Sequence, residues 1–439
     1  MNKKSTLSDI SSVFARTLAF MSVLAIITVC NFQSSTALGQ GVMLRGSGAV
    51  NESMGGAATA CPLDSAGALY WNPASIAGLK QNEMSMGLGV ILPETRVSSS
   101  IRHPDFGLIA DGSTEGEAGS VPVPNMSVVW RPNSCSRWTY GVSMGAVGGA
   151  ATLYASTGDP FNNPILGGLS KSSTVVVMQV TPTVAYKVNN KLSIGAAPVI
   201  DLAALSINPM QLGQPLGANN EIHNYGTRYA WGGGFQLGAY YDFQNHFKTG
   251  FTYKSPVWVE PLRFEGTRVG TSAPVSGKFD FDTPTILSWG ISYDGLRNTV
   301  LAIDVRYFDY AGAAGFEQGV NADNVVMGLG WDSIFSVAAG AQRKINDRFS
   351  VRMGYCWNEN PIPSKSAALN VAAPLMGQHT LSCGATFEIM KDLDFSFTYS
   401  HVFTAELQGN FDAPIGGAIG NVTSEVYADV FMAGITKRW

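Results

Sequence analysis

From Glu83 onward the chain repeats one pattern, in which apolar residues alternate with polar or small ones. About fourteen such runs follow one another, and the clearest lie at 229–241, 285–293, 301–307, 349–358 and 393–400. In the run 349–358, Phe, Val, Met, Tyr and Trp alternate with Ser, Arg, Gly, Cys and Asn. Successive residues of a strand point to opposite faces, so each run predicts a strand with one apolar face. The pattern limits the chain to an all-β fold.

The connections between these runs alternate in length along the whole chain. Short ones lie at 132–136, 188–190, 243–245, 295–297, 346–347 and 391–392, and long ones at 93–124, 149–172, 207–227, 265–279, 309–332, 358–377 and 407–422. A bacterial transmembrane barrel has short periplasmic turns and long extracellular loops, whereas a soluble sandwich has no reason to repeat this alternation. The sequence therefore predicts a 14-stranded antiparallel transmembrane β-barrel.

The composition agrees with a membrane protein that spans the bilayer with strands. Charged residues make up 14% of the chain, against about 25% in a typical soluble protein, so few charges are available to cover a surface in water. After the N-terminus no stretch is apolar and long enough to span as a helix, which leaves a closed barrel as the spanning structure. The net charge of −4 offers no basic surface, so nucleic acid is not expected as a partner.

The first residues have the pattern of an export signal. Basic residues precede an apolar run at 18–29, and the small-residue site Ala37-Leu38-Gly39 follows. A run of about 12 residues is too short for a spanning helix, which needs about 20. We expect residues 1–39 to be a signal peptide, with cleavage after Gly39.

The last run, at about 422–439, ends on Trp439 and carries Phe431, Ala433 and Ile435 on one face. A terminal aromatic strand resembles the signal by which outer-membrane barrels are recognised for assembly. Together with the signal peptide it predicts a bacterial outer-membrane location. The expected partners are the barrel assembly machinery, outer-membrane lipid and lipopolysaccharide, and the protein is expected to be a monomer.

The segment Leu44–Leu79 stands apart from the alternating runs. It is rich in Gly and Ala, carries Asp64, and shows neither helical periodicity nor strand alternation over any length. Its low charge argues against a disordered tail. A barrel of more than about eight strands is too wide for its own side chains to fill. We therefore expect residues 40–82 to plug the lumen as a hatch, and residues 83–439 to form the barrel.

Several segments resemble the family of long-chain fatty acid transporters of the outer membrane, to which toluene and xylene transporters also belong. They are GSG at 46–48, MGGAATA at 54–60, Asp64, NPA at 72–74, and the later segments 180–195, 248–256, 335–355 and 379–401. The resemblance thus covers nearly the whole mature chain. It implies a barrel closed by a hatch that takes up hydrophobic small molecules, most commonly long-chain fatty acids.

The resemblance also implies a route for the substrate. Extracellular loops catch it, a pocket in the lumen receives it, and it leaves sideways into the outer membrane through a gap at an inward kink of the third strand. A lateral exit keeps apolar surface out of water, which is worth about 25 cal/mol per Å². By the same resemblance, Asn72, Pro73 and Ala74 hold the hatch position next to that kink.

The third strand is expected at about 137–147. Gly145, Gly148 and Gly149 are candidates for the kink, because Gly inside a strand often marks a bend or a bulge. The same glycines fit the start of the second long loop equally well.

Candidate substrate contacts are of two kinds. An apolar catch surface, or an ordinary packed loop, would be formed by Leu205, Ile207, Met210, Leu212 and Leu216. Charges that should face the lumen are Lys248, Lys254, Asp304, Arg306 and Arg352. Arg306 or Arg352 would meet a carboxylate substrate, or would pair with other charges of a polar lumen.

Four cysteines follow the signal peptide: Cys61, Cys135, Cys356 and Cys383. Their spacing fits no zinc motif, and no metal or other cofactor is expected. Cys356 and Cys383 fall on opposite faces of adjacent predicted strands, which excludes a disulfide between them. A Cys61–Cys356 pair inside the barrel stays open.

Three other functions compete with transport. An enzyme is not expected. A hydrolase would need a nucleophile, a base and an orienting group on one face of the lumen or rim, and Ser400 and His401, which are adjacent in the sequence, point to opposite faces of their strand. A general diffusion porin would need opposed rows of lumen charges and no plug. A structural or adhesive outer-membrane barrel is compatible with the same strands, and uptake measurements separate it from a transporter.

Overall fold

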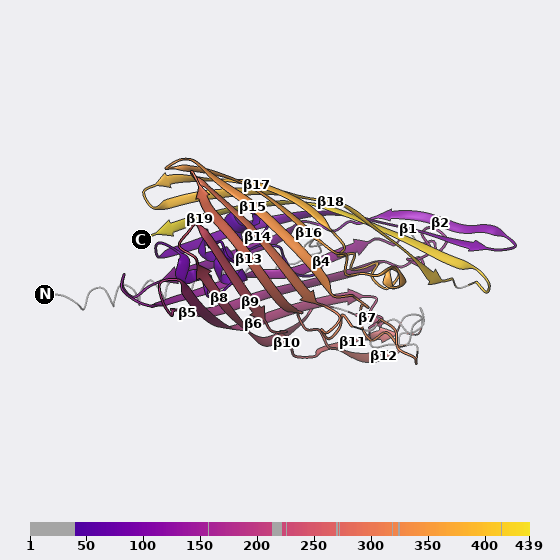
Figure 1. Cartoon of the computed structure of the whole chain (residues 1–439). Coiled ribbons are helices and arrows are strands. Elements are labelled where there is room, and N and C mark those ends of the chain that lie inside the picture. The colour runs from indigo at the N-terminus through magenta and orange to yellow at the C-terminus, as the bar shows by residue number, and fades with distance from the viewer. Residues whose placement is uncertain are drawn as a thin grey trace. The chain divides into compact units, whose positions relative to one another are not determined.

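The structure is a computed structural model of the chain (Figure 1). It describes residues 40–156, 158–212, 222–224, 226–268, 271, 273–317, 319–323, 325–413 and 415–439. The expected signal peptide at 1–39 and the candidate residue Leu216 lie outside this range. Among the described residues, no helix has the length and hydropathy needed to cross a membrane.

Fourteen strands form a closed antiparallel barrel, as the alternating runs predict (Figure 1). They are β1 Glu83–His103, β3 Val121–Trp130, β4 Trp138–Tyr154, β5 Lys171–Lys187, β6 Leu192–Asn208, β8 Arg228–Asp242, β9 Phe247–Lys254, β13 Thr285–Leu296, β14 Thr299–Asp309, β15 Ile334–Asn346, β16 Phe349–Asn358, β17 His379–Met390, β18 Leu393–Asp412 and β19 Ile419–Arg438. Each strand pairs with the next barrel strand along the chain. The first and last strands, β1 and β19, pair with each other and close the barrel.

The two faces of each strand explain why the sequence alternates. In β13, Leu287, Trp289 and Ile291 are exposed on the outside, where lipid surrounds a membrane barrel. On the opposite face of the strand, Ser288 and Ser292 are buried on the inside. The small inner residues leave room in the lumen for other parts of the chain.

Two segments expected as long loops are largely strand. Within 93–124, β1 continues to His103 and returns as β2, Gly107–Glu115, and within 407–422 only 413–418 separate β18 from β19. The outer face becomes polar there, as at Glu94 and Arg96, but the backbone pairing between β1 and β19 continues. Loss of the apolar face marks the edge of the membrane rather than the end of the strand. These strands project at the end opposite the C-terminus (Figure 1).

The other long connections carry short strands. A second sheet consists of β7 Ile222–Asn224, β11 Leu262–Arg268 and β12 Pro274–Phe279, and β10 Trp258–Val259 extends the barrel sheet beside β8. The six short connections fall at 131–137, 188–191, 243–246, 297–298, 347–348 and 391–392. Each lies within two residues of its expected position, and they share the end of the barrel that carries the C-terminus (Figure 1).

The hatch contains helix α2, Gly48–Glu52, helix α3, Ser65–Trp71, and the 3-10 turn η1, Ser75–Gly78; a further 3-10 turn, η3, Ser364–Ser366, lies in a long loop. Asp64 begins α3 by accepting a hydrogen bond from the Gly67 N–H, and Asn72, which precedes Pro73, ends it. The α2 helix contacts β17, β18, β19 and β1, whereas α3 contacts β1, β3 and β4, and η1 contacts β4, β5, β6 and β8. The hatch therefore lies inside the barrel and touches its wall on many sides.

Candidate functional site

One side of the hatch is held by a buried ion pair on β14, which we call the clamp: Asp304 and Arg306. Asp304 Oδ2 accepts hydrogen bonds from Ala58 N at 2.8 Å, Thr59 N at 3.0 Å and Thr59 Oγ1 at 2.8 Å. Arg306 Nη2 donates to Asp304 Oδ2 at 2.7 Å and to Gly56 O at 2.6 Å. Both side chains are completely buried. Charge-assisted bonds of this kind are stronger than neutral ones, so the clamp anchors the middle of the hatch.

The two candidate arginines are both engaged within the protein. The guanidinium of Arg306 lies 3.4 Å from the centroid of the Trp71 ring, which adds a cation–π contact to its hydrogen bonds. Arg352 donates to Gln342 Oε1 at 2.7 Å and to Thr386 Oγ1 at 2.8 Å. In this conformation Arg306 serves hatch attachment and Arg352 serves the polar inner wall.

The motif Asn72-Pro73-Ala74 packs against three glycines of the wall. Asn72 Nδ2 donates to Thr59 O at 2.8 Å and to Ala239 O of β8 at 3.0 Å. A Cβ added to the wall glycines would overlap this motif or the hatch backbone beside it: Gly195 of β6, Gly238 of β8 and Gly250 of β9. The motif thus needs a wall without side chains at these positions. Its neighbours are β6, β8 and β9, which differs from the expected position beside the third-strand kink.

The third barrel strand, β4, loses one neighbour in its outer half. The pairing of β3 with β4 ends at Asn125–Gly145, although β4 continues to Tyr154. Its pairing with β5 shifts register between Ala146 and Gly148, so Val147 is a bulged residue. Gly148 and Gly149 lie inside the strand rather than in the following loop.

Hatch residues occupy the edge that β3 leaves free, and we call this contact the seam: residues 42–44 against 147–149. Leu44 N donates to Val147 O at 2.8 Å, and Gly149 N donates to Val42 O at 3.0 Å. A Cβ at Gly148 would come within 2.8 Å of Val42 O, so only glycine permits this approach. The seam is therefore built from backbone groups.

The hydroxyl group of Tyr70 completes the seam from α3. It donates to Leu44 O at 2.8 Å, and it lies 3.3 Å from Val147 O. Burial raises the pKa of Tyr70, so the phenol stays neutral and remains a donor. Tyr70 thus connects the hatch helix with the bulge of β4.

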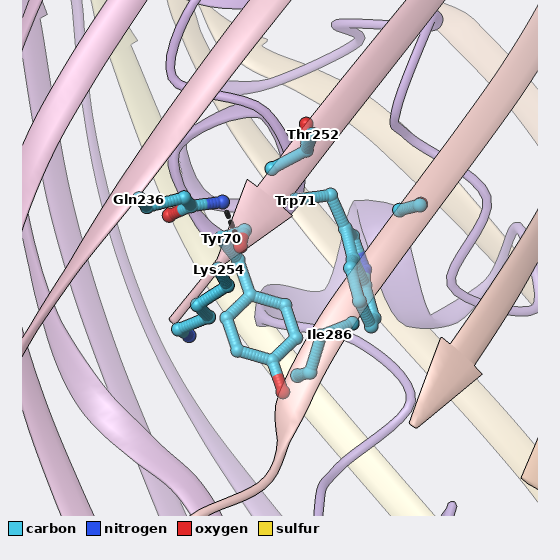
Figure 2. Close-up of a pocket in the computed structure, with 7 residues that line it drawn as sticks. Tyr70, Trp71, Gln236, Thr252, Lys254 and Ile286 are labelled. Atoms are coloured by element: carbon cyan, nitrogen blue, oxygen red, sulfur yellow. Dashed lines mark hydrogen bonds between the residues drawn. The ribbon is translucent and has the colours of Figure 1, made fainter. Parts of the chain in front are cut away.

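A small cavity lies beside this tyrosine in the lumen (Figure 2). It is lined by Tyr70, Trp71, Gln236, Thr252, Lys254, Ile286 and Ser288. Figure 2 shows the Lys254 side chain beside the Tyr70 ring, and the Lys254 ammonium is 5.2 Å from the ring centroid. The cavity has room for about one water molecule. Its lining combines aromatic side chains with the Lys254 ammonium.

The apolar candidates near the long loop are packed rather than exposed. Leu205, Met210 and Leu212 are buried, and Ile207 is partly buried. Met210 and Ile222 form an isolated bridge, with hydrogen bonds in both directions between their backbones. In this conformation these residues do not offer an open catch surface.

The four cysteines are free thiols. Cys61 and Cys356 belong to one buried cluster between hatch and wall, with Met54 and Ala338 among its other members. Burial raises the pKa of Cys61 to about 12. Cys383 is exposed, in agreement with its predicted position on the face opposite to that of Cys356.

Asp64 is the hatch carboxyl with the most perturbed environment. Burial, followed by repulsion from Glu83, raises its pKa to about 7. Its hydrogen bond from Gly67 N, at 3.2 Å, and the more distant positive charges of Arg352 and Arg438 act in the opposite direction. The carboxyl therefore changes its charge near neutral pH.

Sequence reasoning missed Tyr70, Gln236 and the 42–44 contact with β4. Tyr70 and Trp71 could have been singled out from the sequence, because they are the only aromatic residues in the Gly- and Ala-rich segment 44–79. The role of 42–44 carries no such signal, since it depends on backbone groups. Lys254 was placed in the lumen correctly, but its neighbours could not be read from the sequence.

Comparison with known proteins identifies relatives of this arrangement. A family model described as "Outer membrane protein transport protein (OMPP1/FadL/TodX)" matches residues 30–439. The long-chain fatty acid transport protein of Escherichia coli (strain K12) is 24% identical over 386 residues, covering 77% of this chain and 82% of the relative. The protein of the same description from Salmonella typhi is 22% identical over 377 residues, with the same coverage.

Solved structures share the architecture. A Pseudomonas aeruginosa FadL homologue aligns with a TM-score of 0.70 at 15% identity, covering 90% of this chain and 99% of its own. The toluene transporter TodX of P. putida aligns with a TM-score of 0.67 at 16% identity and the same coverage. These likenesses support the hatch-filled barrel as the fold.

Proposed function

Since the chain belongs to the outer-membrane transport protein family of OMPP1, FadL and TodX, and is therefore an outer-membrane transporter of hydrophobic substrates, we propose that its own substrates are long-chain fatty acids. The support is the description of the relatives from Escherichia coli and Salmonella typhi as long-chain fatty acid transport proteins. The toluene transporters among the structural neighbours make aromatic hydrocarbons the second candidate.

The seam supports lateral release into the outer membrane. At 42–44 the hatch replaces β3 as the partner of β4, so the pairing between the wall strands is interrupted here and a hatch segment takes its place. A substrate that leaves at this position enters lipid and keeps its apolar surface out of water. In this proposal Gly145, Gly148 and Gly149 permit the bulge, and Asn72, Pro73 and Ala74 hold the other side of the hatch.

The same arrangement argues against the competing functions. The hatch fills the lumen with buried contacts, which an open diffusion porin would not need. The described histidines form contacts with single carboxylates or with Tyr355, Asn208 and aromatic rings, and none meets an activated nucleophile. We therefore propose a transporter that performs no chemistry on its substrate.

Uptake by cells tests this function. A strain without the gene should take up oleate more slowly than the same strain complemented with it, and a parallel panel of alkylbenzenes tests the second candidate. Equal uptake by both strains for every compound would favour the structural or adhesive barrel. In planar bilayers the purified protein should give little ion conductance, and large steady conductance would favour the porin.

The hatch motif has its own test. Replacing Asn72 by Ala removes the bonds to Thr59 O and Ala239 O and should impair uptake. Barrel assembly should persist, because β1–β19 pairing does not involve this residue, and heat-modifiable mobility on gels measures assembly. Normal uptake by both the Asn72→Ala and the Pro73→Ala variants would contradict a gating role for the motif.

A further inference from the structure

We propose that a basic surface at the periplasmic end of the barrel binds the phosphate headgroups of anionic phospholipids in the periplasmic leaflet of the outer membrane. We call this surface the basic rim, and it consists of Arg297, Arg343, Lys344, Arg348, Lys391 and Lys437. Outer-membrane lipid is expected as a partner in general, whereas the basic rim selects one leaflet and one class of headgroup. Such binding does not depend on which substrate the barrel transports.

The basic rim is one continuous surface, because its turns are hydrogen-bonded to one another. Lys344 N donates to Asn298 O at 2.8 Å and joins the first two turns. A backbone hydrogen bond of 2.9 Å from β17 to Arg348 O continues the series, and Lys437 Nζ donates to Lys391 O at 3.1 Å. These turns lie at the end of the barrel that carries the C-terminus (Figure 1). The cations are therefore neighbours in space although they are far apart in sequence.

The charges of the basic rim are exposed and unpaired. All six residues are exposed, and none of them forms an ion pair with another described residue. The carboxylates beside them are fewer, namely Asp347, Glu388 and Asp392. The whole chain has a net charge of −4, so this excess of positive charge is local. The basic rim can therefore accept anions without first breaking an internal contact.

The opposite end of the barrel carries the opposite charge. The projecting parts of β1, β2, β18 and β19, with the residues that flank β2, contain only Arg96 and Arg102 as basic residues. Their carboxylates are Glu94, Asp105, Asp111, Glu115, Glu117, Glu406, Asp412 and Glu425. The sign of the surface charge thus changes across the membrane. The cations lie at the end that meets the periplasmic leaflet, which consists of phospholipids.

The basic rim directly borders the surface that faces lipid. Lys437 lies two residues beyond the exposed Ile435 on the outer face of β19. Beside Arg348, the rings of Phe349 and Phe387 stack with their centroids 4.5 Å apart, and Phe387 is exposed. Aromatic residues at this position form the interfacial girdle of a membrane barrel. Basic side chains next to it place their carbon stems on apolar surface and their charges at the level of the headgroups.

This combination favours a lipid over a soluble anion. Clusters of lysine and arginine next to a membrane bind anionic headgroups, and each cation adds to the attraction. A guanidinium group matches the oxygens of a phosphate with two parallel hydrogen bonds, and three members of the basic rim are arginines. The apolar surface beside them accommodates the acyl chains of the same molecule. We therefore expect a preference for anionic over zwitterionic phospholipids of equal chain length.

Lipid binding to the purified full-length protein in a nonionic detergent tests this preference. Dioleoylphosphatidylglycerol supplies the anionic headgroup and dioleoylphosphatidylcholine the zwitterionic one, and native mass spectrometry measures the bound lipid. The wild type should bind phosphatidylglycerol more tightly. The variant Arg343→Gln/Lys344→Gln/Arg348→Gln should lose about tenfold or more in affinity for phosphatidylglycerol, because three attractive charges are removed. Its affinity for phosphatidylcholine should not change.

Two further variants separate charge from other effects. Arg102→Gln/Arg263→Gln/Lys365→Gln removes three exposed cations from the long connections and projecting strands of the other end, and it should bind both lipids as the wild type does. Arg343→Lys/Arg348→Lys keeps the charge and should keep the preference for phosphatidylglycerol. Heat-modifiable mobility on gels shows that each variant is a folded barrel.

Equal affinity of the wild type and the first variant for phosphatidylglycerol would overturn the proposal, as would an equal loss in the variant of the other end. Peptidoglycan is a second anionic partner available in the periplasm, and sedimentation with purified sacculi measures its binding. We expect equal sedimentation of the wild type and the first variant. Loss of sedimentation in this variant, with an unchanged lipid preference, would assign the basic rim to the cell wall instead. None of these results bears on uptake of the substrate, which is measured separately.

Discussion

The clamp and the seam attach opposite sides of one hatch by different physical means. The clamp uses two fully buried charges on β14, which meet the hatch at Gly56, Ala58 and Thr59. The seam uses two backbone hydrogen bonds and one phenol against a strand that has lost its neighbour. Breaking a buried charge pair costs about 3–5 kcal/mol, whereas a neutral bond contributes about 0.5–1.5 kcal/mol. The two attachments therefore differ in the free energy expected to break them, and under the proposed function the seam is the side that releases.

The largest effect is expected from a variant that removes the clamp. Asp304→Ala takes away the acceptor of three hatch donors and leaves Arg306 buried without its partner. We expect hatch docking to weaken by about 3–5 kcal/mol, measured as faster protease cleavage of the hatch and higher ion conductance. Arg96→Ala breaks the exposed pair with Glu115 and should change neither quantity. A closed, protected hatch in Asp304→Ala would refute the clamp.

A second change tests whether the wall beside the Asn72-Pro73-Ala74 motif must lack side chains. Gly238→Ala places a Cβ in overlap with Asn72 and close to Pro73, whereas a Cβ at Gly233 of the same strand meets nothing within 4 Å. Overpacking of this kind costs about 1–3 kcal/mol. Uptake should therefore fall in Gly238→Ala and stay normal in Gly233→Ala. Equal uptake by the two variants would show that the hatch does not depend on this close packing.

The smallest effect expected near neutral pH comes from Asp64, which lies between the two attachments in sequence. Its pKa is about 7 in the folded protein against a usual value of 3.8. The folded state thus holds a proton that the unfolded state releases, so docking is fully stable at low pH and weakens as the pH rises through 7. Hydrogen exchange of the hatch should become faster from pH 5 to pH 8.

Asp64→Asn keeps a good N-cap for α3 and removes the titrating group. Its hatch exchange, corrected for the intrinsic pH dependence of exchange, should be independent of pH over this range. A slope equal to that of the wild type would assign the pH dependence to another group.

The amino-acid sequence by itself determined the barrel. Period-two alternation specifies which side chains face lipid, and the alternating connections specify which end carries the turns, because both depend on local spacing alone. The Gly- and Ala-rich segment at 44–79 was predicted as a plug because its composition suits neither a strand nor a tail. The lumen positions of Arg306, Arg352 and Lys254 also follow from the alternation of side chains between the two faces of a strand.

Only the tertiary structure decided which wall residue meets which hatch residue. The alternation of side chains along a strand places Arg306 and Lys254 inside the barrel. Arg306 binds the hatch, whereas Lys254 borders a cavity, because barrel closure and the stagger of the strands determine their neighbours. The seam is made of backbone atoms at 42–44 and 147–149. Contacts between backbone groups cannot be predicted from the types of the residues that make them. Backbone edges become available or occupied only when strands pair, so the seam is a property of the fold.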